Sequence, residues 1–146
     1  MNKGKTLLLI SVALLVASLS VADGPKFTEE QGIPEGKALV YIYFPVSYYP
    51  TRVVATVMAN QKPVTTLEKG YYFPYIVAPG SIDFWATQTT EPSVKCITHV
   101  ILDVEAGRDY FLHVGADLFA VMLQALPRET AMQTITTCCL NEAAAD

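Results

Sequence analysis

The sequence lacks the motifs that identify the common classes of enzyme. It has no GxSxG of the serine hydrolases, no HExxH of the zinc proteases and no glycine-rich phosphate loop. Its carboxylates are scattered, whereas nucleophilic catalysis needs a nucleophile, a base and an orienting group brought together. We therefore expect a protein that is not an enzyme and holds no cofactor.

Clusters of basic residues are also missing. The 146 residues include 10 Lys and Arg against 14 Asp and Glu, for a net charge of −4. Nucleic acids and anionic membrane surfaces attract basic patches. Neither is an expected partner.

A run of apolar residues long enough to cross a membrane is absent. The longest run, Leu7–Val16, follows Lys3 and Lys5 and precedes the small residues Ser20 and Ala22. This pattern is typical of a secretory signal peptide, whereas a membrane-spanning helix needs about 20 apolar residues. We expect residues 1–22 to be removed after Ala22.

The exported part then carries eight basic and fourteen acidic side chains, a net charge of −6. A lipid anchor needs a cysteine at the cleavage point, and the first cysteine is Cys96. We expect a periplasmic or secreted protein with no membrane anchor after cleavage. Its length suits one domain at 37–140, preceded by an extended arm at 23–36 and followed by a frayed tail at 141–146.

Cysteine is scarce, with only Cys96, Cys138 and Cys139. An oxidising compartment favours disulfides, and an odd count leaves one thiol over. We expect Cys96 to pair with Cys138 or Cys139, since a bridge between the two neighbours needs a strained ring. No spacing resembles a zinc ribbon or a redox CxxC motif.

The stretch 70–87 predicts a β-hairpin, because two apolar, aromatic runs flank a Pro-Gly turn at 79–80. A register that pairs Val77 with Ile82 gives the hairpin one core-facing set of side chains. That set comprises Tyr71, Phe73, Tyr75, Val77, Ile82, Phe84 and Ala86. Tyr72 and Trp85 lie on the opposite face.

Three further strands precede this hairpin. In the stretch 37–44, both alternating sets of side chains are apolar, which predicts a strand that is covered on both faces. The stretches 52–59 and 62–67 predict two strands joined by a two-residue turn at 60–61. Pro63 places the second of these at a sheet edge.

A second hairpin is predicted from 94–104 and 108–114, which flank a three-residue loop ending in Gly107. Its register places His99 opposite His113. Two imidazoles at that separation could share a transition metal, although their neighbours are apolar and also suit two packed, neutral histidines.

The end of the chain mixes two kinds of pattern. The stretch 118–126 is compatible with a strand or a helix, and the preceding strands favour a strand. Pro127 and an apolar repeat predict a helix over 127–140. Together the patterns give an all-β antiparallel sandwich of seven to eight strands with a short C-terminal helix.

The motifs GKALVYIYFP, LEKGYYFPYIVAPGSIDFWA and LDVEAGRDYFLHVG occur in this order between 36 and 140. In this order they resemble a family of small, uncharacterised bacterial envelope proteins, many of them lipoproteins. The resemblance implies a transthyretin-like or PEGA-like β-sandwich in the bacterial envelope. It implies no activity.

Aromatic side chains outside the predicted core are the candidate binding residues. Tyr48 and Tyr49 lie in a loop between two prolines, and Tyr72 and Trp85 lie on the hairpin face away from the core. Exposed rings give contact area at low entropic cost, whereas a ring covered by the terminal helix or the other sheet only packs. We expect an accessory protein that binds another envelope protein. The alternative is a module that binds carbohydrate or a small ligand on the same rings.

Overall fold

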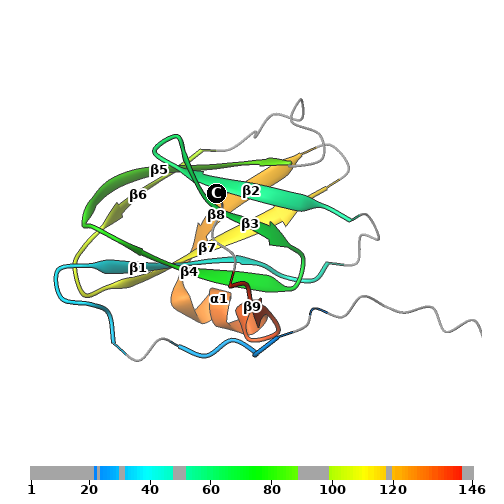
Figure 1. The fold of residues 1–146 in the computed structure, drawn as a ribbon, viewed down its shortest axis with the longest axis horizontal. Helices are drawn as coiled ribbons and strands as arrows, with labels where there is room; N and C mark the ends of the chain where they lie inside the picture. Colours follow the sequence, from blue (N-terminus) through cyan, green and yellow to red (C-terminus); the bar gives the residue numbers. More distant parts are fainter. Residues whose placement is uncertain are drawn as a thin grey trace, which may run out of the picture.

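The computed structural model is a two-layer β-sandwich with one short helix, as the sequence predicts (Figure 1). Its described residues form nine strands instead of the predicted seven to eight, and two of the strand pairs are parallel where the sequence predicts an antiparallel sandwich. It describes residues 22, 24–29, 32–47, 52–88, 99–117 and 120–142. The leader to position 21, Tyr48, Tyr49 and Cys96 lie outside these residues.

The two sheets have five and four strands. The five-stranded sheet contains, in spatial order, β8 (Val121–Leu126), β7 (Asp109–Ala116), β1 (Ala38–Phe44), β4 (Tyr71–Val77) and β9 (Cys139–Leu140). The four-stranded sheet contains β3 (Lys62–Glu68), β2 (Val54–Ala59), β5 (Gly80–Gln88) and β6 (Val100–Val104). The helix α1 (Arg128–Ile135) lies between β8 and β9 in the sequence.

The central strand β1 explains the sequence pattern at 37–44. It pairs antiparallel with β4 and parallel with β7, and all seven of its residues are buried. Val40 and Ile42 point into the core between the sheets, while Tyr41 and Tyr43 belong to a second cluster on the outer side. A strand covered on both faces is apolar on both faces.

Both predicted hairpins are in fact connections between the two sheets. The turn at 79–80 joins β4 in one sheet to β5 in the other, and Gly107 lies in the loop that joins β6 to β7. The predicted pairing of Val77 with Ile82 is therefore wrong: Val77 pairs with Ala38, and Ile82 pairs with Leu102.

The predicted core-facing set is nevertheless confirmed. Ile82, Phe84 and Ala86 are buried in the core, and the inward side chains of β4 pack partly buried against it. Alternation along a strand decides which side chains point inward, whichever strand lies next to it.

The predicted turn at 60–61 and the edge position of β3 are both confirmed. Asn60 and Gln61 have φ values of 47° and 67°, the left-handed pair of a tight hairpin turn. Pro63 lies on β3, at one edge of the four-stranded sheet, next to a register shift between Val57 and Met58. Proline fits there because it has no N–H to donate to a ladder.

The C-terminal segment differs from its prediction. The helix spans only Arg128–Ile135, and the chain then turns into β9, which pairs parallel with β4. The ambiguous stretch at 118–126 contains the strand β8. No described segment forms a helix long and apolar enough to cross a membrane.

The described part of the N-terminal arm packs against this segment. Phe27 is buried, and its N–H donates a hydrogen bond to the Cys138 carbonyl at 2.9 Å. Next to it, the backbone of Lys26 forms an isolated antiparallel β-bridge with Cys139. The arm and α1 together lie on the outer side of the five-stranded sheet (Figure 1).

The predicted disulfide is wrong. Cys138 and Cys139 are buried free thiols, and burial raises the pKa of Cys138 to about 12. Cys138 packs in the cluster on the outer side of the five-stranded sheet, and Cys139 lies in its edge strand β9. Cys96 lies outside the described residues.

The turn at 60–61 provides a stability test. Gln61 has a left-handed φ of 67° that glycine adopts at no steric cost. Gln61→Gly should raise the free energy of unfolding by about 0.5–1 kcal/mol, because relief of strain outweighs the added chain entropy. Thermal melting of the two proteins measures this gain.

The matched control is Lys62→Gly, one residue later in β3. Lys62 has no left-handed φ, so the same glycine should lower the melting temperature there. If Gln61→Gly also lowered the melting temperature, the assigned turn would be wrong.

Candidate functional site

The structure separates the aromatic candidates that it describes. Tyr72 is only 4% exposed and contacts Phe27, at 5.0 Å between ring centroids. Its expected role as a surface platform is therefore wrong, because the N-terminal arm covers it. Tyr48 and Tyr49 lie outside the described residues.

Trp85 lies on the outer face of the four-stranded sheet and is partly exposed. It pairs with Met58 on β2, which in turn pairs with Pro63 on β3. On its other side the ring stacks on His99, with centroids 6.0 Å apart and planes 23° from parallel. These residues form a row across the sheet.

An acidic partner fixes the histidine of this row. His99 Nδ1 lies 3.0 and 3.1 Å from the two carboxylate oxygens of Asp83. An ionised carboxylate only accepts hydrogen bonds, so Nδ1 carries the proton. The neutral imidazole then presents Nε2 as an acceptor, and the His99 side chain is 56% exposed.

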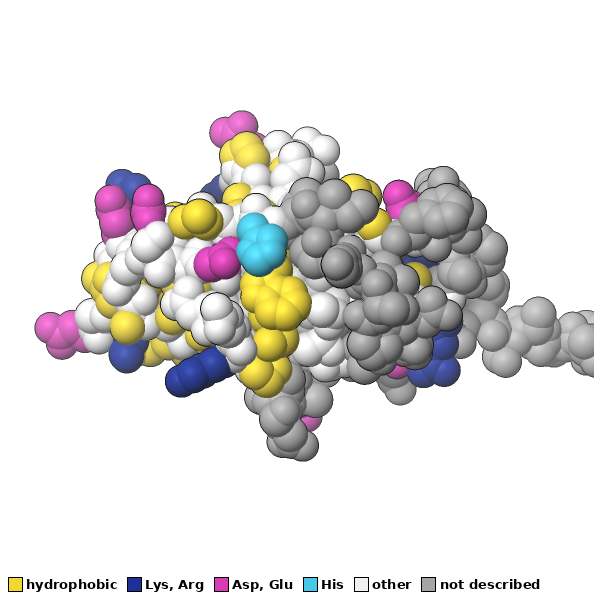
Figure 2. All heavy atoms as spheres, turned by 90° about the horizontal axis from the view of Figure 1, so that it is seen from above, with side chains coloured by type: hydrophobic (Ala, Val, Ile, Leu, Met, Phe, Trp, Pro, Cys, Tyr) yellow, Lys and Arg dark blue, Asp and Glu magenta, His cyan; other side chains and the backbone are white. Residues whose placement is uncertain are grey.

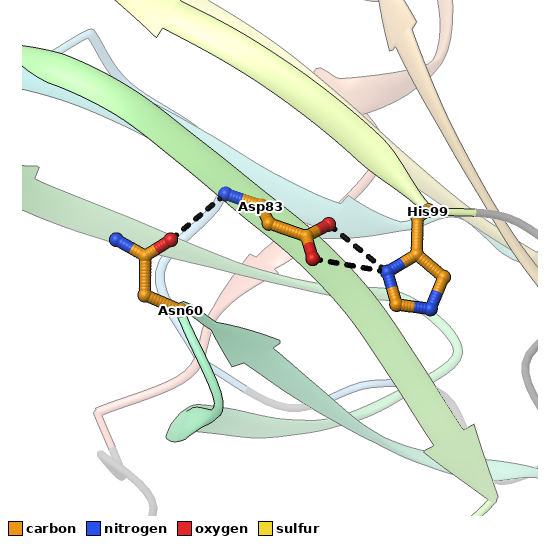
Figure 3. Close-up of polar contacts among 3 residues, drawn as sticks. All are labelled: Asn60, Asp83 and His99. Carbon is orange, nitrogen blue, oxygen red and sulfur yellow. Dashed lines mark hydrogen bonds and ion pairs between the residues drawn. The ribbon is translucent and has the colours of Figure 1, made fainter.

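Asn60 holds Asp83 from the other side (Figure 3). Its side-chain oxygen accepts a hydrogen bond from the Asp83 N–H at 3.0 Å, as Figure 3 shows. Its backbone N–H also donates to the Asp83 carbonyl at 2.9 Å. Asn60 thus extends the β2–β5 pairing by one residue and has the left-handed φ that the turn requires. The turn, β5 and the start of β6 together position the imidazole.

Figure 2 looks onto this face and shows one histidine side chain beside an acidic one and a run of hydrophobic ones. Ile101, which pairs with Asp83, is 71% exposed. We call the set Met58, Asp83, Trp85, His99 and Ile101 the tryptophan face. No described helix or strand covers it (Figure 1).

The predicted histidine pair is wrong. His99 precedes β6 in the four-stranded sheet, whereas His113 lies on β7 in the other sheet, against the ring of Tyr43 at 5.4 Å. The register that placed them opposite each other assumed that β6 and β7 pair, which they do not. Among the described residues, no group of three or more His, Cys, Asp or Glu side chains could hold a metal ion.

Two cavities lie away from the tryptophan face. One, of about 320 Å³, lies beside Tyr110 and the start of α1, where Arg128 pairs with Asp109 at 2.5 Å and with Glu29 of the arm. The other, of about 280 Å³, lies beside Tyr71 and includes Asn141. Arg128 is engaged by two carboxylates, so its role in the first cavity is to hold the arm.

The pairing of Asp83 with His99 is what sequence reasoning missed. The pattern placed Asp83 on the same face as Trp85, but it assigned His99 to a different hairpin. A β5–β6 register would have revealed the contact, since Phe84 pairs with Val100 and the preceding residue is His99.

Comparisons with known proteins add no family to this description. No protein-family model matches the chain, and no curated protein matches it either. The functional argument therefore depends on the geometry of the site.

His113 makes stability depend on pH. Burial lowers the pKa of this histidine, so the folded state favours the neutral ring. The stability that the neutral ring of His113 contributes is fully present above the unfolded-state pKa of about 6.5. It is lost as the pH falls below that value. The free energy of unfolding should therefore decrease from pH 7.5 to pH 5, by no more than about 1.4 kcal/mol per pH unit for one proton.

Chemical denaturation of wild type, His113→Gln and His99→Gln at both pH values tests this assignment. His113→Gln should show a smaller decrease than wild type, and His99→Gln, which changes an exposed ring, should keep most of it. An unchanged decrease in His113→Gln would show that another group carries the pH dependence.

Proposed function

We propose that this protein is a non-enzymatic binding module of the bacterial envelope that recognises another protein through the tryptophan face. The observation that carries the proposal is the asymmetry of the sandwich. The arm and α1 cover the outer side of the five-stranded sheet, while among the described elements none covers the side of the other sheet that bears Trp85 and Ile101.

The composition of the face supports a protein partner. Trp85, Met58 and Ile101 provide apolar contact area, and Asp83 and His99 border them with polar groups. Protein interfaces have this arrangement, in which an aromatic anchor is surrounded by polar residues at the rim. Both described cavities lie elsewhere, so the face is better suited to a broad partner than to an enclosed small molecule.

Catalysis is less well supported than binding. An acid–histidine pair such as Asp83 and His99 is the base and orienting group of many hydrolases, but it needs a nucleophile beside the free ring nitrogen. Within the described residues, His99 has no hydrogen bond to a hydroxyl or thiol group. We therefore assign the pair to recognition.

A carbohydrate ligand is the second candidate. The near-parallel rings of Trp85 and His99 give a flat surface with hydrogen-bonding groups at its border, which also suits the face of a sugar ring. The proposed location in the envelope comes from the leader pattern and from the resemblance of the motifs to envelope proteins.

Site-specific photo-crosslinking tests the proposed function. A photoreactive amino acid in place of Ile101 should form a specific adduct with an envelope protein, because this side chain is 71% exposed on the tryptophan face. The same amino acid in place of Ile76, 49% exposed on the other sheet, should not. Adding Trp85→Ala should reduce the yield at position 101 about tenfold, as expected for a central aromatic anchor.

Equal adducts from positions 76 and 101, or a yield unaffected by Trp85→Ala, would contradict the proposal. If no adduct forms at position 101 but soluble glycan fragments quench Trp85 fluorescence saturably, the carbohydrate alternative replaces it.

A further inference from the structure

The tryptophan face has an excess of negative charge. Asp83 and Asp103 both lie on its surface, on β5 and β6. Glu68, the other acid of these strands, is neutralised by Arg52 at 2.9 Å. Lys62, the one cation within the four described strands, is exposed at the β2–β3 turn on the edge strand. Two carboxylates, Asp83 and Asp103, therefore stand against one cation along these strands.

A partly exposed carboxylate lies next to the aromatic anchor. Asp83 and Trp85 are two residues apart on β5, so both point outward side by side. A guanidinium group can pair with a carboxylate through two hydrogen bonds while it stacks on an indole ring. An ammonium group can form the ion pair but not the planar stack.

We infer that the partner presents an arginine-bearing segment, whose guanidinium group pairs with Asp83 and packs on Trp85. This inference depends on the proposed function and names the chemistry of its partner. The charge and geometry of the face favour arginine over an acidic or purely apolar segment, because either of those leaves Asp83 without a counterion beside the interface.

Titration of the exported chain, residues 23–146, with an amidated tetra-arginine peptide tests the inference. Fluorescence of Trp85, the single tryptophan, reports binding. We expect saturable binding at pH 7.5, several-fold weaker binding of tetra-lysine and none of tetra-glutamate. Asp83→Asn and Glu35→Gln remove the same charge, but Glu35 lies in the turn before β1, away from the face. Asp83→Asn should weaken binding about tenfold, and Glu35→Gln should leave it unchanged.

A thermal melt of each variant confirms that it is folded.

Two results would overturn the inference: no binding of tetra-arginine to wild type, or equal binding after Asp83→Asn. If tetra-arginine does not bind but the crosslink at position 101 forms and depends on Trp85, the inferred arginine is wrong and the proposed binding face is retained. If both fail, the proposed function is wrong as well.

Discussion

The packing of Phe27 against Tyr41 and Tyr72 is the interaction on which the arrangement of this protein depends. It joins the N-terminal arm to the outer side of the five-stranded sheet, with ring centroids 5.2 and 5.0 Å apart. The arm also bonds to Cys138, and Arg128 ties Glu29 of the arm to the start of α1. The arm and α1 bury these rings and cover the outer side of this sheet, so among the described elements the uncovered face of the sandwich is the one that carries Trp85.

The open face is ordered by backbone geometry as well as by side chains. Asn60 closes the β2–β3 turn and bonds to both backbone groups of Asp83, and Asp83 in turn orients His99. Because each group is fixed by its neighbour on an adjacent strand, the ring of Trp85 has a defined border on its β6 side. A preorganised surface loses less conformational entropy on binding than a flexible one.

Sequence patterns predicted which side chains point inward but not which strands are neighbours. Phe84 and Ala86 were assigned to the core correctly because alternation depends only on the strand itself. The partners of β5 were wrong because proximity in sequence suggested hairpins where the chain crosses between sheets. Tyr72 and Trp85 followed the same pattern, yet one is buried and the other is not. That difference depends on where the arm and α1 dock, a long-range contact that no local pattern contains.

The central claim is that the tryptophan face is uncovered in the folded protein. Because Trp85 is the only tryptophan, its fluorescence reports on this face alone. Quenching by the neutral agent acrylamide, in the native protein and after unfolding in guanidinium chloride, measures its accessibility directly. The structure predicts native quenching by acrylamide at a substantial fraction of the unfolded value, with emission shifted toward that of water-exposed indole. Emission typical of a buried indole, with almost no quenching by acrylamide, would contradict it.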